Sequence, residues 1–143
     1  MTSINIHKKK IKEHIEEIRD AVEVGIENRP ITIGFHCSAC AIELLEFYLH
    51  KLGKISSGKI IKHDWFKRPR PEQKTLPLVD RKLPVTFPDK EKIYELIYTI
   101  EENRNSLIYG KATKSQIKTV LDAFNKLRTL IEKKLKDMGE WIE

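Results

Sequence analysis

The sequence predicts an all-α protein, an antiparallel up-and-down four-helix bundle with a long crossover, containing short helices, between the second and third helices. Four segments repeat apolar residues every three or four positions, which is the period of an amphipathic helix. No segment reads convincingly as a strand, and the connection between the first two helices is long enough only for an antiparallel turn. Bundles of this kind tolerate one long crossover, so the pattern fits a single helical domain over residues 1–143.

The first two helices are expected over residues 5–27 and 30–53. The apolar stripe of the first consists of Ile11, Ile15, Ile18, Val22 and Ile26. Pro30 suits the first position of the second helix, where a missing N–H costs nothing, and Gly53 suits its end. The second helix has two apolar rows, Ile31, Phe35, Ser38, Ile42, Leu45, Leu49, Leu52 and Cys37, Ala41, Leu44, Tyr48. Two rows predict the most buried helix of the bundle.

Residues 54–88 form the crossover, which contains five prolines and no sustained period. A connection of this length indicates function or short internal helices, and residues 60–66 are one candidate for such a helix. The third helix is expected to begin at Asp89 as its N-cap and to end at Gly110. Thr113 and Gln116 have the spacing of a capping box that begins the fourth helix. The stripe of that helix consists of Ile117, Leu121, Phe124, Leu127, Ile131, Leu135, Met138 and Ile142.

Composition and charge limit the possible domain number, partners and location of the protein. A chain of 143 residues usually makes one domain, and its net charge of +6 and pI near 9.3 favour a polyanionic partner. Cys37 and Cys40 are its only cysteines, which excludes a disulfide framework and a four-cysteine zinc site. Neither an apolar signal core nor an apolar run of roughly 20 residues is present, so no membrane partner is expected and the cytoplasm is the predicted location.

Two groups in the second helix could bind a metal or act in acid–base chemistry. His36, Cys40 and Glu43 offer three ligand types that zinc accepts, and Glu43 with Glu46 could form a carboxylate pair. The alternative is that the cysteines are small core residues and the carboxylates belong to a polar helix face. The second interpretation is favoured, so neither a metal nor a cofactor is expected.

Basic residues in the crossover flank two aromatic rings in "KHDWFKRPR". Such a segment can hold a phosphate backbone while an aromatic ring stacks on a base. Its candidate ligand-binding residues are Lys62, His63, Trp65, Lys67, Arg68 and Arg70. The alternative is that Trp65 and Phe66 cap the bundle core and the charges form a solvated rim.

Arg104 interrupts the apolar stripe of the third helix. The stripe consists of Ile93, Ile97, Ile100 and Leu107, and Arg104 stands between the last two. Either its methylenes lie along the core while its guanidinium reaches water, or the helix presents a fixed positive charge there. Asn103, Asn105 and Ser106 surround it, and these residue types do not favour helix formation.

Three features of the sequence point to a known family: the second helix "FHCSACAIELLEFYLHKLG", the following "IKHDWF", and Arg104-Asn105 five residues before a ring side chain and a glycine. Together they resemble the HEPN family (higher eukaryotes and prokaryotes nucleotide-binding). The resemblance implies an all-helical, dimeric domain. Many family members are metal-independent ribonucleases with an Arg-x4–6-His motif, in which the arginine stabilises the phosphate and the histidine transfers protons during attack by the ribose 2′-hydroxyl. Tyr109 stands in the place of that histidine, and Lys111 in the place of a tyrosine found in members paired with a nucleotidyltransferase.

The resemblance and the residues together predict a homodimeric RNA- or nucleotide-binding protein with lost or weak ribonuclease activity. One alternative is a protein-interaction module or toxin-like partner of a separately encoded nucleotidyltransferase. Another is an active ribonuclease that uses Tyr109 or His63 in place of the family histidine. Arg104 and Tyr109 are the candidate catalytic residues, and Asn105 and Lys111 join the crossover residues as candidates for ligand binding.

Overall fold

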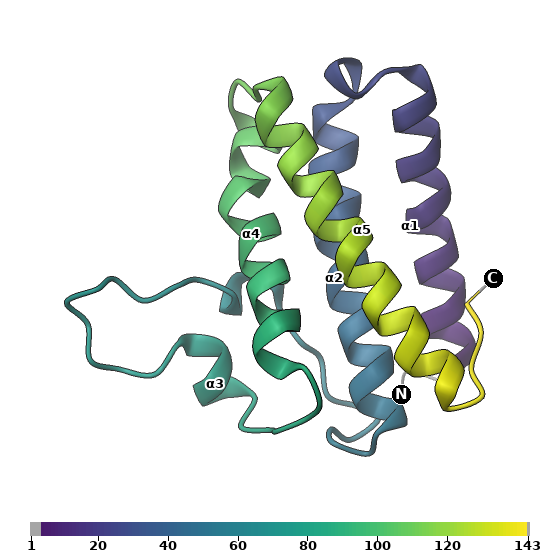
Figure 1. Cartoon of the computed structure of the whole chain (residues 1–143), viewed down its shortest axis with the longest axis vertical. Helices are drawn as coiled ribbons and strands as arrows, with labels where there is room; N and C mark the ends of the chain where they lie inside the picture. Colours follow the sequence, from purple (N-terminus) through teal and green to yellow (C-terminus); the bar gives the residue numbers. More distant parts are fainter. Residues whose placement is uncertain (1–3, 143) are drawn as a thin grey trace.

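The computed structural model describes residues 4–142, and all regular structure in this range is helical. Its four long helices are α1 (Ile4–Val24), α2 (Pro30–Lys51), α4 (Lys90–Tyr109) and α5 (Lys114–Asp137). They run alternately up and down, with both described ends of the chain at the end of the bundle where the crossover leaves α2 (Figure 1). The predicted fold class, a helical bundle with a long crossover between its second and third long helices, is confirmed.

Helix α2 is the central element of the bundle, since it packs against α1, α4 and α5. Both of its predicted apolar rows contribute to the core, and Leu44, Leu45 and Leu49 are fully buried. The first residues of one row are the exception, because Ile31 and Phe35 are 58% and 47% exposed. The prediction that Ile31 and Phe35 are core residues is wrong. The heptad pattern extends to the N-terminal end of α2, but the neighbouring helices do not cover this face of α2 there.

Local sequence signals explain most helix ends. Gly53 ends α2 in a left-handed conformation (φ 72°), which a residue without a Cβ adopts at little cost. The N–H of Lys54 then donates to the Leu49 carbonyl (2.9 Å) and that of Gly53 to the His50 carbonyl (3.0 Å), which is a Schellman motif. The capping box of α5 is confirmed, because the Thr113 hydroxyl accepts from the Gln116 N–H at 3.1 Å.

Two predicted boundaries differ from the structure. Helix α1 ends at Val24 and is followed by Gly25 (φ 118°) and the 3-10 helix η1 (Ile26–Asn28), which replaces its predicted last turn. Asp89 occupies the N-cap position of α4 but does not cap it. Its carboxylate instead pairs with Lys134 Nζ of α5 at 2.8 Å, which also lowers the pKa of Asp89.

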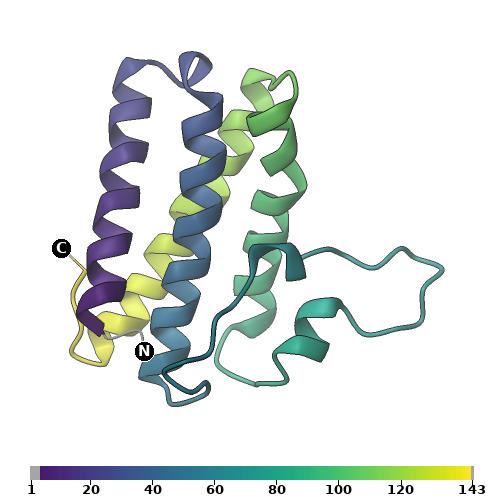
Figure 2. The same ribbon diagram turned by 180° about the vertical axis from the view of Figure 1, so that it is seen from behind.

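The crossover is attached to the bundle by apolar residues at both ends. It contains the 3-10 helix η2 (His63–Trp65) and α3 (Leu78–Lys82), and the chain between them extends away from the bundle (Figure 2). Phe66 is 1% exposed and meets the ring of Tyr94 edge-on at 5.2 Å. Of the two interpretations of the aromatic pair, core packing is therefore the correct one for Phe66, and Trp65 is partly buried against the same core.

Helix α2 is also long and apolar enough to cross a membrane, with a mean hydropathy of 1.2 over an 18-residue window. Two thirds of that window (67%) is buried inside the bundle. Its apolar residues therefore contact α1, α4 and α5, which is the behaviour of a core helix and is compatible with a soluble protein.

Helices α2 and α4 approach closely at Gly34, where an added Cβ would lie 2.8 Å from Leu107 Cβ. We expect Gly34→Val to lower the free energy of unfolding by about 1–3 kcal/mol, because the helices have to separate to accommodate it. The matched control is Gly58→Val, since an added Cβ at Gly58 meets no atom within 4 Å. Thermal unfolding of the two variants measures this, and equal melting temperatures would contradict the close approach.

Candidate functional site

A cleft of about 350 Å³ lies between the segment around η2 and the C-terminal half of α4, and we call it the α4 cleft. It is lined by His63, Asp64, Phe66, Lys67, Arg68, Glu101, Glu102, Arg104 and Asn105. The structure thus brings together five of the residues that the sequence predicts for ligand binding or catalysis, from two segments that are about 40 positions apart.

Arg104 lies in this cleft as a cation without a partner among the described residues. Its neighbours on the α4 stripe, Ile100 and Leu107, are buried, so the start of the Arg104 side chain lies beside the core. Its Nε atom is buried and has no hydrogen-bond acceptor, and no ion pair with Arg104 occurs in residues 4–142. A buried donor without an acceptor is rare and costs about 1–3 kcal/mol, and Tyr94 OH is a second such atom in residues 4–142. No carboxylate of the described residues compensates the guanidinium of Arg104.

His63 is held in the same cleft by a carboxylate of α4. Its Nδ1 lies 2.7 Å from Glu101 Oε1, and the other oxygen of Glu101 accepts a hydrogen bond of 2.5 Å from the buried Ser38 hydroxyl of α2. Because the carboxylate accepts from the ring's Nδ1–H, a neutral His63 keeps the lone pair on Nε2. This arrangement provides an oriented imidazole that can take up a proton.

The remaining charges of the cleft are partly compensated. Arg68 Nε donates to Glu102 at 2.9 Å, its NH1 pairs with Glu95, and its guanidinium lies over the Tyr98 ring. The hydrogen bond with Glu95 is the main reason why the pKa of Arg68 is raised. Arg68 therefore anchors the crossover to α4, and the cations that remain for a ligand are Lys67, which is exposed, and Arg104.

Tyr109 and Lys111 do not line the α4 cleft. Tyr109 is 78% exposed at the end of α4, and its position five residues after Arg104 turns it roughly 140° around the helix from that residue. Lys111 is exposed beyond the helix end. The structure therefore separates the two residues that the motif of the resemblance would pair, Arg104 and Tyr109.

The other predicted crossover residues also lie outside this cleft. Trp65 is partly buried with Lys59 Nζ 5.6 Å above its ring, so one face of the indole is already covered. Arg70 is exposed and lies 3.4 Å from Glu72. Lys62 lines a neighbouring cleft of about 440 Å³, which we call the α2 cleft and which shares His63 and Asp64 with the α4 cleft.

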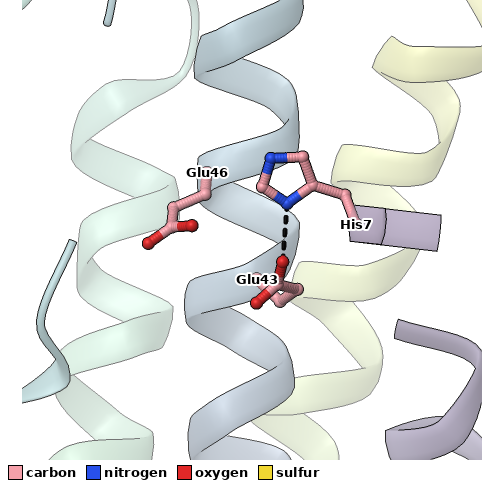
Figure 3. Close-up of side chains that lie close together, drawn as sticks. All are labelled: His7, Glu43 and Glu46. Carbon is pink, nitrogen blue, oxygen red and sulfur yellow. Dashed lines mark hydrogen bonds and ion pairs between the residues drawn. The ribbon is translucent and has the colours of Figure 1, made fainter. Parts of the chain in front are cut away.

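The α2 cleft has Glu43 and Glu46 in its wall, and behind them lies His7 of α1 (Figure 3). His7 is fully buried, and its Nδ1 is 2.6 Å from Glu43 Oε1. Glu46 Oε2 accepts from the Ile61 N–H at 2.8 Å, and burial raises the pKa of this carboxyl. Ligand atoms of the three side chains all lie within 4.8 Å of one another, close enough that they could hold a metal ion after small movements.

His7 is absent from the residues that the sequence predicts for a site. The available signal is its position, four residues before Ile11 on the apolar stripe of α1, where a polar side chain has to find a buried partner. Its partner Glu43 is 36 positions away, and no local pattern indicates this pairing.

The set formed by His36, Cys40 and Glu43 is not brought together as metal ligands in residues 4–142. His36 Nδ1 faces His14 Nδ1 at 2.8 Å. Both cysteines are fully buried, and burial raises the pKa of their thiols, which disfavours the thiolate that zinc needs. The interpretation of Cys37 and Cys40 as core residues is correct.

The chain was compared with protein-family models, with curated proteins and with solved structures, and no match was found in any of the three. The residues and their geometry are therefore what supports a function for this protein.

Proposed function

We propose that this protein binds RNA or a nucleotide through a phosphate group in the α4 cleft. The observation that carries the proposal is the guanidinium of Arg104, whose buried Nε has no acceptor in residues 4–142. A phosphate is the complementary ligand, because its oxygens accept the planar pair of N–H groups that a guanidinium presents. Lys67 adds a second cation at the rim of the same cleft, and Asn105 adds an amide.

The charge of the whole chain supports an anionic ligand. A net charge of +6 attracts a polyanion from a distance, and counterion release adds affinity that does not depend on sequence. Inside the cleft, however, Glu101 and Glu102 oppose an anion unless their charges are compensated. Arg68 compensates Glu102, so Arg104 and Lys67 have to attract the anion against the remaining carboxylates of the cleft, Glu101 and Asp64.

A second candidate function is metal-independent cleavage of RNA, and the position of His63 favours it. His63 lines the same cleft as Arg104, and Glu101 orients its ring. With Nε2 unprotonated, His63 can take the proton of a ribose 2′-hydroxyl while that oxygen attacks the phosphorus. The P–O5′ bond then breaks, the departing 5′-oxygen takes up a proton, and a 2′,3′-cyclic phosphate remains.

The cytoplasm is the location that we infer for either function, because Cys37 and Cys40 are both free and buried. The HEPN resemblance is part of the proposal only as a source of the same expectation, an arginine that contacts phosphate in a helical domain.

We expect Arg104→Ala to weaken RNA binding by about 1–3 kcal/mol, the scale of hydrogen bonds to a charged group. Its melting temperature should stay close to or rise above that of the parent, because removing Arg104 leaves no partner in residues 4–142 unsatisfied and relieves the cost of its unpaired Nε. Arg104→Lys should keep the salt-dependent attraction but not recover full affinity, since an ammonium lacks the planar pair of donors. Fluorescence anisotropy with a single-stranded RNA at two salt concentrations measures these affinities.

The control for this series is Arg81→Ala, which removes the same charge from α3 outside the α4 cleft. It should lose much less affinity than Arg104→Ala. Equal RNA binding by the parent and Arg104→Ala, together with a lower melting temperature of that variant, would assign Arg104 a structural role and end the proposal.

If the α4 cleft cleaves RNA, cleavage should persist in excess chelator and end in a 2′,3′-cyclic phosphate. His63→Ala should then lower the rate by about 10²–10⁴-fold, the usual contribution of a general base. Tyr109→Phe should leave the rate unchanged, because Tyr109 lies outside the cleft. A loss of cleavage in Tyr109→Phe and not in His63→Ala would assign the reaction to Tyr109. A parent without activity leaves ligand binding as the function.

We further propose that the protein is a homodimer that uses the N-terminal part of α2. Ile31 and Phe35 lie one turn apart there and are 58% and 47% exposed, an apolar surface of the kind that interfaces cover. Phe35→Glu should shift the mass measured by light scattering from dimer to monomer. Leu76→Glu, at a residue that is 65% exposed in the crossover, is the matched control and should remain a dimer. A monomeric parent at micromolar concentration would contradict the proposal.

A further inference from the structure

Helices α1 and α2 enclose a chain of hydrogen bonds that contains more acceptors than two neutral histidines can satisfy. At one end His50 Nε2 lies 2.8 Å from the Ser56 carbonyl oxygen, and in the middle His50 Nδ1 lies 2.8 Å from His7 Nε2. At the other end His7 Nδ1 lies 2.6 Å from Glu43 Oε1. Both ends of the chain are oxygens that accept hydrogen bonds.

Three hydrogen bonds of this kind need three protons on the two rings, if Glu43 is a carboxylate. Two neutral imidazoles provide only two. A ligand of His7 Nδ1 that takes the place of its proton would leave enough protons for the other two hydrogen bonds of the chain.

We propose that His7, Glu43 and Glu46 form a binding site for a divalent transition-metal ion, with Zn²⁺ as the best match. The three side chains come from α1 and from adjacent turns of α2, with His7 and Glu43 facing each other and Glu46 beside them (Figure 3), and their ligand atoms lie within 4.8 Å of one another. One imidazole nitrogen and two carboxylate oxygens are ligands that zinc accepts. Ligand atoms of a tetrahedral zinc ion are about 3.4 Å apart. The ion would therefore move His7 Nδ1 and Glu43 Oε1 apart from their present 2.6 Å, while the Glu46 carboxylate moves closer to both.

Groups outside the ligand set are already arranged as a metal site requires. A histidine ligand usually donates its other ring N–H to a neighbouring group, which fixes the ring. His7 Nε2 has such a neighbour in His50 Nδ1, and His50 in turn donates to Ser56. The His7 ring is also stacked on Phe47, with 5.6 Å between the ring centroids. The Ile61 N–H holds one oxygen of Glu46.

The ion would have an open side. Glu43 and Glu46 line the α2 cleft, so an ion bound to three protein ligands has room there for water or another ligand. Three protein ligands with one exchangeable position are typical of zinc sites that are not purely structural. None of the three ligands lines the α4 cleft, so the metal site is independent of the proposed phosphate site.

The test is binding of Zn²⁺ to protein stripped of metal by a chelator, measured by equilibrium dialysis and by calorimetry. We expect one ion per chain and a higher melting temperature in its presence. Glu46→Gln and Glu43→Gln should each weaken binding by at least tenfold. Glu46→Gln should keep the fold, because its amide oxygen can still accept from the Ile61 N–H. Glu132→Gln is the matched control, since it also removes a paired carboxylate, and it should bind zinc as the parent does.

A measurement on the parent protein decides the question if a variant fails to fold. Co²⁺ bound to one nitrogen and two oxygens in a site of low symmetry should give a visible absorption band that zinc removes. Binding should also release a proton, seen as a dependence of the calorimetric heat on the buffer.

Absence of saturable binding by the parent would overturn the proposal and leave His7 and Glu43 as a hydrogen-bonded pair. Equal affinity of the parent and both glutamine variants would also overturn it, because binding would then be at other surface groups. Arg104→Ala should leave zinc binding unchanged, so the phosphate site and the metal site can fail separately.

Discussion

The buried polar groups of α2 are the constraint on which the rest of the structure depends. A helix surrounded by α1, α4 and α5 cannot leave polar side chains without partners, since each would cost about 1–3 kcal/mol. Ser38 donates to Glu101 of α4, Glu43 faces His7 of α1, and Glu46 accepts from the crossover at Ile61. Each of these bonds ties a different segment to α2 at one position along its length. Apolar packing brings the helices together, and these bonds fix where along α2 each segment is attached.

Both clefts result from these attachments. Glu101 is held by Ser38 and in turn holds His63, so the side of the α4 cleft formed by the crossover is positioned from α2. Glu46 accepts a hydrogen bond from the Ile61 N–H and so fixes the chain two residues before His63. This places Lys62 and His63 along the α2 cleft. The crossover is thus pinned at Ile61 and His63 by hydrogen bonds and at Phe66 by burial. Its loop can extend from the bundle without loosening the residues that line the clefts.

The parts of the structure that the sequence predicts are those with local causes. Helix periods, the Schellman motif at Gly53 and the Thr113 capping box all depend on residues a few positions apart. Arg104 was detectable for the same reason, because a charge on an apolar stripe is visible within one helix. The pairing of His63 with Glu101 and of His7 with Glu43 depends on how the crossover and α1 lie against α2. These partners are 38 and 36 positions apart, and no period or short motif relates them. Ile31 and Phe35 show a second limit of sequence reasoning, because an apolar pattern on one helix does not say whether another helix covers it.

Tyr109 in place of a motif histidine therefore has less effect on the chemistry of the α4 cleft than the sequence suggests. A side chain at this position points away from Arg104, at the exposed end of α4, whatever residue stands there. The imidazole that shares the cleft with Arg104 comes from the crossover, and the carboxylate that orients it lies on α4, three residues before Arg104. The groups of the proposed acid–base and phosphate sites thus come from one short stretch of α4 and one turn of the crossover. The same stretch contains Asn103 and Asn105, poor helix formers, between the buried Ile100 and Leu107. Helix stability alone does not favour this composition. Asn103 donates to the Thr99 carbonyl within the helix, whereas Asn105 lines the α4 cleft with Arg104, where we propose that a phosphate binds.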